Sequence, residues 1–319
     1  MFRLLAALIV SLAASAAAAQ SFPSKPVRLI VPYPAGGLTD VLARGLSAEI
    51  VKLWGQTLIV ENRPGASQMI GAEALAKSPP DGYTLAMLDK TPLAINPFLF
   101  SKLPYDPLKD FAPVINMVQT SQVLVAYPGL PANNITQLVE LAKSKPGGIN
   151  YGTFGAGSIT HLDTEAFAAA AGIKLTHIPY KGIAEVLPAV ASGQIQIALS
   201  GIPPMLPLAR QGRIKVLGAM TPQRVPVLPD VPTFAEQGYP LVSSSWFALF
   251  APAGTPRPII DKIAADVGRV ISQKEFDERF ITGVGLEMLN QGPEQLAATV
   301  AADRVKYQAY VKAVNVKLD

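Results

Sequence analysis

Short β-branched runs alternate with helix-forming stretches along most of the sequence, and this alternation limits the possible folds more than any other feature. One set lies between residues 27 and 88, and a second set lies between residues 135 and 220. Strands that alternate with helices form parallel sheets with helices on their faces, so the sequence predicts two α/β lobes. The predicted strands are Val27–Val31, Leu58–Glu61, Tyr83–Leu88, Ile149–Gly152, Leu175–Pro179, Ile195–Leu199 and Ile214–Met220. The predicted helices are Thr39–Leu53, Ser67–Lys77, Ile135–Lys145, Ser158–Ala171, Gly182–Ser192, Pro204–Gln211, Pro256–Ser272, Lys274–Thr282 and Gly292–Val316.

Two extended segments are expected to join the lobes. The run APVINMVQTSQVLVAYP, residues 112–128, is too long for an ordinary strand and has polar residues in its middle. The run SSSWFALFAP, residues 243–252, is interpreted as the return crossing. Two crossings place both chain ends in one lobe and describe a cleft that hinges shut on a ligand, as in type II-like periplasmic binding proteins (Venus flytraps). The predicted division is 20–121 plus 246–319 for lobe 1 and 122–245 for lobe 2.

The first 19 residues have the pattern of a secretory signal peptide. Arg3 precedes the apolar run Leu4–Ala14, and small residues precede a cleavage point near Ala19. The apolar run is shorter than the roughly 18–20 residues that a membrane helix needs. The chain contains no cysteine, so acylation of a cysteine after the leader is excluded. We therefore expect a periplasmic protein without a lipid anchor.

Charge and residue usage argue against several function classes. The net charge is +4, and Lys and Arg are scattered and not interleaved with aromatic residues, so nucleic-acid binding is not predicted. Two histidines and no cysteine leave few ways to build a catalytic triad or a metal site, and no cofactor is expected. Ser158, His161 and Asp163 share one helical turn, which does not allow the usual line of nucleophile, base and orienting acid. The sequence therefore favours a binding protein over an enzyme.

Two glycine loops each lead from a predicted strand into a predicted helix. They are PAGGLTD, residues 34–40, and TFGAGS, residues 153–158. Glycines allow close approach of the backbone, and the N-terminus of a helix presents unpaired N–H groups at the positive end of its dipole. Either loop is also compatible with a simple tight turn, whereas the glycine spacing does not match a dinucleotide fingerprint. One such loop in each lobe would suit the two ends of a small anion.

Eight separated motifs, in order from about Lys25 to the C-terminus, resemble the Bug family of periplasmic solute-binding receptors, which are associated with tripartite tricarboxylate transporters. The resemblance implies a two-lobed flytrap that binds a small organic acid. In that family, loops like Tyr33–Asp40 and Thr153–Ser158 hold carboxylates through backbone N–H groups and ordered waters. The motifs are VRLIVPYPAGGLTDVLAR, VENRPGAS, PDGYTLAML, AINPFLFSKLPYDPLKDFAPV, YGTFGAGSITHL, HIPYKG, LPDVPTFAEQGYP and WFALFAPAGTP.

The sequence departs from the family pattern where specificity would be set. Gln68 and Met69 replace smaller or polar residues, and the pair Asp89–Lys90 replaces a hydroxyl-rich run. Lys90 is a candidate partner for a ligand carboxylate, while Asp89 would orient it or meet a ligand amine or hydroxyl. The alternative is a solvated or mutually paired Asp and Lys on a rim. The expected ligand-binding residues are Tyr33, Ala35, Gly36, Gly37, Thr39, Asp40, Lys90, Thr91, Thr153, Phe154, Gly155, Ala156, Gly157, Ser158, His161, Tyr180 and Ser200.

The expected function is capture of a mono- or dicarboxylate by a monomeric receptor and its delivery to a membrane permease. A flytrap that reports its ligand to a membrane sensor protein would need the same features, so the sequence leaves this alternative open. In either case, closure requires ligand contacts from both lobes.

Overall fold

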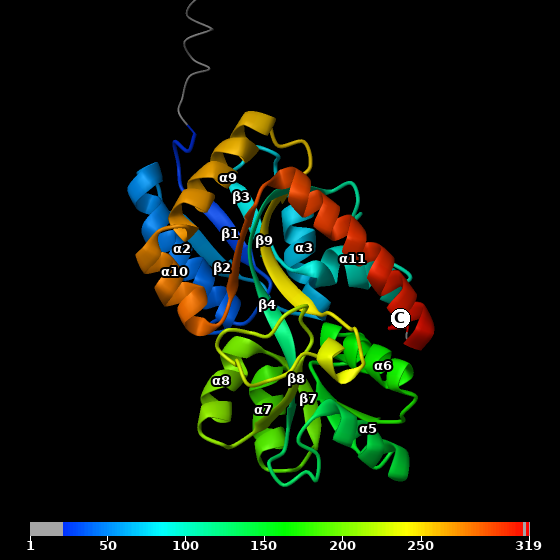
Figure 1. Ribbon diagram of the computed structural model, residues 1–319. Coiled ribbons are helices and arrows are strands. Elements are labelled where there is room, and N and C mark those ends of the chain that lie inside the picture. The colour runs from blue at the N-terminus through cyan, green and yellow to red at the C-terminus, as the bar shows by residue number, and fades with distance from the viewer. Residues whose placement is uncertain (1–21, 315–316, 319) are drawn as a thin grey trace, which may run out of the picture.

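The computed structural model describes residues 22–314 and 317–318, and it contains two α/β lobes, one above the other in Figure 1. The predicted leader lies outside these residues. A single path of paired strands runs through both lobes in the order β2-β1-β3-β9-β4-β7-β5-β6, with β10 and β8 also paired to β4. In the described ranges, no helix is long and apolar enough to cross a membrane.

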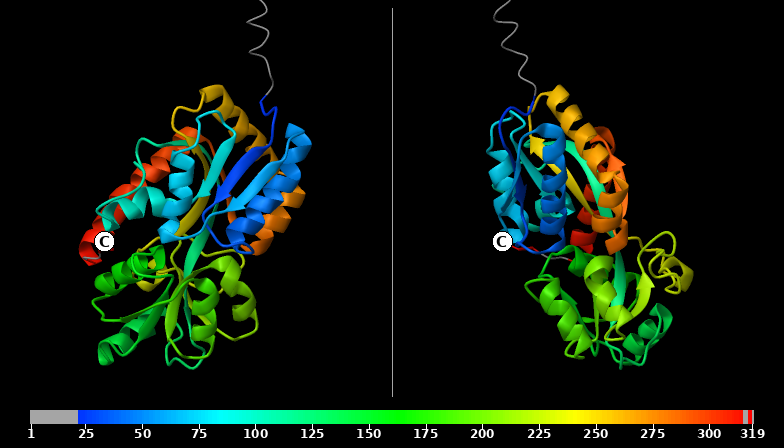
Figure 2. Two further views of the ribbon diagram at one scale, coloured as in Figure 1. Left: turned by 180° about the vertical axis from the view of Figure 1, so that it is seen from behind. Right: turned by 90° about the vertical axis from the view of Figure 1, so that its left-hand side faces the viewer.

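The first lobe has a mixed sheet between two helical layers. Strands β1, β2 and β3 are parallel, and β9 runs antiparallel to β3. Helices α2 and α9 pack with α10 on one face, and α3 and α11 cover the other, as the two views of Figure 2 show. Every residue of β3 is buried, as expected for a strand covered on both faces. The elements are β1 (Val27–Val31), α2 (Leu38–Trp54), β2 (Leu58–Asn62), η2 (Ala66–Gln68), α3 (Met69–Ala76), β3 (Thr84–Leu88), the π-turn η3 (Thr91–Ile95), α4 (Asn96–Leu99), β9 (Ser244–Pro252), α9 (Arg257–Ile271), α10 (Lys274–Phe280), η5 (Thr282–Val284), β10 (Glu287–Gln291) and α11 (Pro293–Val314).

The second lobe repeats this layered arrangement on a smaller scale. Parallel strands β5, β6 and β7 join the second half of β4. Helices α5 and α6 pack on one side of this sheet, and α7 and α8 pack on the other. The elements are α5 (Ile135–Ser144), β5 (Asn150–Thr153), α6 (Ile159–Ala171), β6 (Thr176–Pro179), α7 (Ile183–Ala191), β7 (Ile197–Gly201), α8 (Ile202–Arg210), β8 (Lys215–Ala219) and η4 (Ala235–Gln237).

Strand β4 (Phe111–Ala126) belongs to both sheets and forms the first connection between the lobes. Its residues 111–121 pair with β9, and its residues from Gln122 onward pair with β7 and β8. The chain returns at Ser243, whose N–H bonds Met220 and whose carbonyl accepts from Gln122. Strand β9 itself lies entirely in the first sheet, so the return crossing is the short segment before it.

The C-terminal helix α11 forms a further contact between the lobes (Figure 1). Tyr307 and Val311 of α11 share an apolar cluster with Leu162 of α6 and with Leu99 of the first lobe. A Cβ atom on Gly157 would lie 2.6 Å from Cδ1 of Leu99, so the backbone of the second glycine loop is pressed against the first lobe. The lobes are therefore packed against each other at a point outside the connecting strands.

The predicted boundaries of the helices and strands lie within two residues of the observed ones in the described part of the chain, and two of the largest differences have local causes. Residues 66–68 form a kinked 3₁₀ turn with three consecutive positive φ angles, so the helix expected from Ser67 begins at Met69. Helix α8 begins at Ile202 because prolines are tolerated in the first turn of a helix. Strand β10, which the sequence does not predict, pairs irregularly with β4.

Candidate functional site

The first glycine loop, between β1 and α2, leaves backbone N–H groups free at the start of the helix. Gly37 is the N-cap residue of α2 and has no side-chain cap. Among the described residues, the N–H groups of Gly37 and Leu38 have no hydrogen-bond acceptor. Ala35, Gly36 and Gly37 are exposed, and Gly36 has a φ of +82°, which favours glycine. The geometry suits an anion at the positive end of the α2 dipole.

Asp40 stabilises this loop through hydrogen bonds of its buried carboxylate. Its Oδ2 accepts a hydrogen bond from the Gly36 N–H at 2.9 Å and from Arg44 Nε at 2.9 Å, and its Oδ1 accepts from Asn62 Nδ2 at 2.9 Å. The hydrogen bond from Arg44 is the largest reason why the pKa of Asp40 is lowered to about 2. Thr39 and Asp40 are buried, so these two expected contacts have their side chains below the exposed backbone.

The second glycine loop, between β5 and α6, uses most of its N–H groups internally. The Gly155 N–H bonds Thr153 Oγ1 at 3.2 Å, and the Gly157 N–H bonds Nδ1 of His161 at 3.0 Å. Ser158 caps α6 by accepting from the His161 N–H at 3.3 Å. The N–H groups of Phe154 and Ser158 also have acceptors, while within the described chain those of Ala156 and Ile159 have none. Ala156 is exposed and Phe154 is half-buried.

A stack of three rings supports the second loop. The rings of His161 and His177 lie 4.1 Å apart with an angle of 16° between their planes, and Tyr151 stacks on His177 at 5.1 Å. Burial lowers the pKa of His161, and burial with the facing His161 lowers the pKa of His177 to about 4. Because Nδ1 of neutral His161 accepts the Gly157 N–H, this side chain acts here on the loop backbone. His177 lies on β6, and its Nε2 shares a hydrogen bond with Thr153 Oγ1 at 2.6 Å.

A polar cluster lies at the ends of β1 and β3. The Tyr33 hydroxyl donates a hydrogen bond to Oδ2 of Asp89. Oδ1 of Asp89 accepts from Gln68 Nε2 at 3.0 Å and from the backbone N–H of Thr91 at 2.7 Å. Burial raises the pKa of Tyr33, and the charge of Asp89 raises it further. Tyr33 also packs edge-on against Phe247, with the ring centroids 6.4 Å apart.

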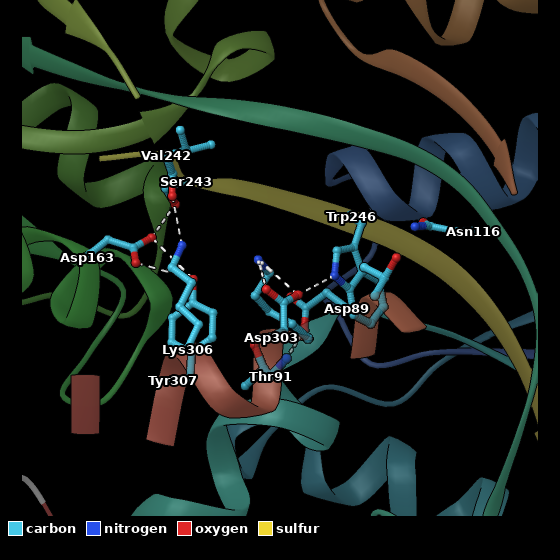
Figure 3. A network of polar contacts seen from close by, with 12 residues as sticks. Asp89, Thr91, Asn116, Asp163, Val242, Ser243, Trp246, Asp303, Lys306 and Tyr307 are labelled. Atoms are coloured by element: carbon cyan, nitrogen blue, oxygen red, sulfur yellow. Dashed lines mark hydrogen bonds and ion pairs between the residues drawn. The ribbon is translucent and has the colours of Figure 1, made fainter. Parts of the chain in front are cut away.

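Lys90 points away from this cluster. It is 2% exposed, and its Nζ lies 3.3 Å from Oδ2 of Asp303 on α11, which also accepts from Trp246 Nε1 at 2.7 Å. Figure 3 shows Asp303 next to the Trp246 indole. This placement differs from the expectation that Lys90 pairs with a ligand carboxylate, because neighbouring residues after the strand project in different directions. It also differs from the alternative of a solvated rim pair, since both Asp89 and Lys90 are buried.

Asp163 lies at the contact between the lobes, where it is 1% exposed. It accepts hydrogen bonds from the Ser243 hydroxyl and from the Tyr307 hydroxyl, the latter at 3.2 Å (Figure 3). Burial raises the pKa of Asp163, although Lys306 counteracts the shift. The Lys306 Nζ itself donates to the carbonyl of Val242 at 2.8 Å. The short-range sequence pattern gives no indication of these contacts with α11.

Two remaining candidates are placed less favourably for ligand contact. Ser200 is fully buried on β7 and its hydroxyl donates to the Gly201 carbonyl at 2.8 Å. Tyr180 is half-buried, its N–H bonds the Thr153 carbonyl, and its ring packs with the core of the second lobe. Ser200 is therefore omitted from the site proposed below, and Tyr180 stays a prediction.

The described part of the chain contains no group of three or more His, Cys, Asp or Glu side chains arranged to hold a metal ion. An apolar groove of about 460 Å³ lies on the first lobe between α11 and residues 107–113. Neither glycine loop lines this groove, so the candidate site is defined by the polar geometry of the loops.

Comparison with known proteins identifies the family. The family model described as tripartite tricarboxylate transporter family receptor matches residues 42–316. Protein BugT of Bordetella pertussis is 34% identical over 324 residues, which cover 100% of this chain and 99% of BugT.

Two solved structures share both fold and sequence with this chain. Rpa4515 of R. palustris, solved with adipate, has a TM-score of 0.86 and 32% identity, covering 93% of this chain and 99% of its own. MatC (Rpa3494) from Rhodopseudomonas palustris, solved with bound malate, has a TM-score of 0.81 and 31% identity, covering 91% of this chain and 100% of its own. The flytrap architecture, the family match over residues 42–316 and the full-length similarity to BugT lead to one conclusion: this chain belongs to the Bug family of solute-binding receptors of tripartite tricarboxylate transporters.

Proposed function

We propose that this receptor binds a small mono- or dicarboxylate between its lobes and delivers it to a membrane permease. The observation that carries the proposal is the first glycine loop, where the N–H groups of Gly37 and Leu38 are unpaired within the described chain at the N-terminus of a 17-residue helix. A carboxylate there would satisfy both donors and the helix dipole. The adipate and malate bound by two relatives support the same ligand class.

The second loop would close on the ligand from the opposite lobe. Ala156 and Ile159 offer N–H groups without acceptors among the described residues, and waters could extend their reach. In this proposal, residues 122–245 move as one lobe relative to 20–121 and 246–319. The ligand favours the closed form only through its higher affinity for that form, which is why contacts from both loops are needed. The leader would direct the mature receptor to the periplasm.

The proposal is tested by a thermal-shift screen of the mature protein against mono-, di- and tricarboxylates, aromatic acids and amino acids. A ligand at 100 times its dissociation constant adds about 2.7 kcal/mol to the free energy of unfolding. This corresponds to a rise of a few degrees in Tm for a chain of this size. No rise with any acid, after unfolding and refolding to remove a carried-over ligand, would contradict carboxylate capture.

A substitution in the first loop tests whether the ligand binds to the backbone N–H groups there. Gly37 has a φ of −78°, and an added Cβ would meet only the Pro34 carbonyl oxygen at 3.6 Å, so Gly37→Val should fold. Its side chain would obstruct access to the loop N–H groups, and we expect affinity to fall at least tenfold. Gly292→Val is the matched control, because Gly292 precedes α11 in open space. An unchanged affinity in a folded Gly37→Val variant would contradict the proposal that the first glycine loop binds the ligand.

A further inference from the structure

We propose that a subsite formed by Asp89, Gln68 and Tyr33 binds a positively charged, hydrogen-bond-donating group on the ligand. The preferred ligands are then amino-substituted organic acids. This inference rests on the proposed function, because it assumes that the ligand's carboxylate binds the first loop. It specifies which chemical group the ligand carries in addition to that carboxylate.

The subsite lies beside the loop that would hold the carboxylate. Strands β1 and β3 are parallel neighbours, with Ile30 opposite Ala86. The residues that follow the two strands therefore emerge at the same edge of the sheet, where ligands of open α/β sheets bind. The hydrogen bond from Tyr33 to Asp89 joins the two strand ends directly.

The subsite has unused hydrogen-bond acceptors. An ionised carboxylate offers about four acceptor directions, and the three donors to Asp89 leave one of them free on Oδ2. Gln68 is 9% exposed, and its Oε1 is buried without a hydrogen-bond partner in the described structure. The orientation of the amide is fixed, because the atom facing the Asp89 carboxylate must be the donor Nε2. Buried acceptors without partners are costly, so a ligand that donates to them gains affinity.

The charge around Asp89 also favours a cation. The nearest lysine in sequence, Lys90, is paired with Asp303 on α11. Arg44 is paired with Asp40. In the described chain, no lysine, arginine or histidine forms an ion pair with Asp89, so its negative charge is balanced only by neutral donors. A second ligand carboxylate placed here would meet repulsion, whereas an ammonium would be attracted.

Gln68 is held in position by an unusual backbone. Ala66, Ser67 and Gln68 all have positive φ angles between 46° and 69°, although none of them is glycine. Asn96 Nδ2 holds this turn by bonding the Ser67 carbonyl at 2.9 Å. The turn fixes Gln68 against Tyr33, to whose hydroxyl Nε2 also donates at 2.9 Å. A preorganised amide of this kind discriminates between ligand groups better than a mobile one.

The test is isothermal titration with two matched pairs of acids, each pair differing only in an amino group: succinate with aspartate, and butyrate with 4-aminobutyrate. We expect the amino member of at least one pair to bind tenfold or more tightly than its partner. Equal or weaker binding of both amino members would overturn the subsite and leave carboxylate capture intact. Failure of all four acids in titration, together with no rise in Tm in the acid screen, would instead contradict the proposed function itself.

Substitutions locate the preference on the named residues. Asp89→Asn should retain binding of the plain acids and lose the preference for the amino acids. Gln68→Met removes the free acceptor and the hydrogen bonds that Nε2 donates to Asp89 and Tyr33, without changing charge, and it should reduce the preference by a smaller factor. Glu49→Gln is the charge-matched control, because Glu49 lies on α2 paired with Lys52. If Asp89→Asn keeps the full preference for the amino-substituted acids, the assignment of the subsite to these residues is wrong. If Asp89→Asn does not fold, the same result for Gln68→Met has the same meaning.

Discussion

The Tyr307 hydroxyl of α11 donates a hydrogen bond to the buried carboxylate of Asp163 on α6, with 3.2 Å between Oη and Oδ1. The two residues are 144 positions apart and belong to different lobes. This hydrogen bond holds the lobes together next to the return crossing at Ser243, so it stabilises one relative position of the lobes over others. The free energy of this hydrogen bond affects how much binding free energy the ligand must supply to close the lobes.

Tyr307→Phe should therefore shift the lobes toward an open arrangement. A hydrogen bond to a charged group contributes about 1.5–3 kcal/mol, and its loss leaves Asp163 with the Ser243 hydroxyl as its remaining neutral side-chain donor. The chain has no cysteine, so spin labels on Lys102→Cys and Lys174→Cys, one in each lobe, would report the distance between lobes directly. We expect a longer or broader distance distribution and weaker ligand binding.

Tyr310→Phe is the control for this experiment. Tyr310 lies on the same helix, its ring centroid is 5.7 Å from that of Tyr307, and its hydroxyl has no hydrogen bond to another described residue. The same distance distribution for Tyr307→Phe and Tyr310→Phe would show that the hydrogen bond to Asp163 does not hold the lobes.

The Lys90–Asp303 ion pair should contribute to stability and not directly to ligand affinity. Removing one partner of a buried pair costs about 3–5 kcal/mol, and the partial exposure of Asp303 places Lys90→Met toward the lower limit. The double variant Lys90→Met/Asp303→Asn should regain much of this loss, because no unpaired charge is left and the amide oxygen can still accept from Trp246 Nε1. Urea unfolding measures the stabilities, and titration measures affinity. A folded Lys90→Met variant that has lost dicarboxylate binding would restore Lys90 as a ligand contact.

The stacked histidines should make stability depend on pH between about 4 and 6.5. Their folded pKa values are lowered, so the unfolded chain binds more protons in this range and stability falls as the pH falls. The charge of Glu165 raises the pKa of His177 and so reduces this effect. The pKa of Asp163 is raised in the folded protein, so its protonation makes stability rise as the pH falls and partly offsets the histidines. The expected loss from pH 7 to pH 5 is about 1–2 kcal/mol after allowance for partial exposure of the rings.

Urea unfolding of the wild type and His177→Gln at pH 7, 6 and 5 isolates the histidine contribution. The difference between the two proteins should shrink as the pH falls. The sequence has two histidines, so NMR of their ring protons can also follow each titration. Midpoints at or above 6.5 for both rings would contradict the buried, neutral pair.

Asp40→Asn should loosen the first loop. The substitution weakens the acceptor for the Gly36 N–H and removes the charge that Arg44 bonds, a change comparable to the loss of a helix cap at about 1 kcal/mol. Since the pKa of Asp40 is lowered to about 2, its contribution is present above its ordinary pKa and is lost as the pH falls toward 2. Affinity for carboxylates should fall together with stability. Asp261→Asn, which breaks an exposed pair with Arg257, is the control and should change neither by more than about 0.5 kcal/mol.

Most of the fold could be predicted because its signals are local. The burial of β1 follows from the run VRLIV, and the α2 core face follows from apolar residues spaced four apart at Leu42, Leu46 and Ile50. Strand β10 was missed because its residues EMLNQ lack an alternating pattern and Asn290 interrupts it with a φ of +46°. The glycine loops were found because turns and helix starts also have local signatures.

The sequence by itself determined the two α/β lobes, the family and the two glycine loops, since these depend on residues close together along the chain. Only the tertiary structure decided which polar side chains meet. Lys90 and Asp303 are 213 positions apart, and Tyr307 reaches Asp163 across 144. Such pairs depend on how α11 packs over both lobes, and no short-range periodicity specifies that packing. For the same reason Asp89 faces Tyr33 and Gln68 while its neighbour Lys90 faces the opposite side: the direction of each side chain is fixed by the packing around the strand end.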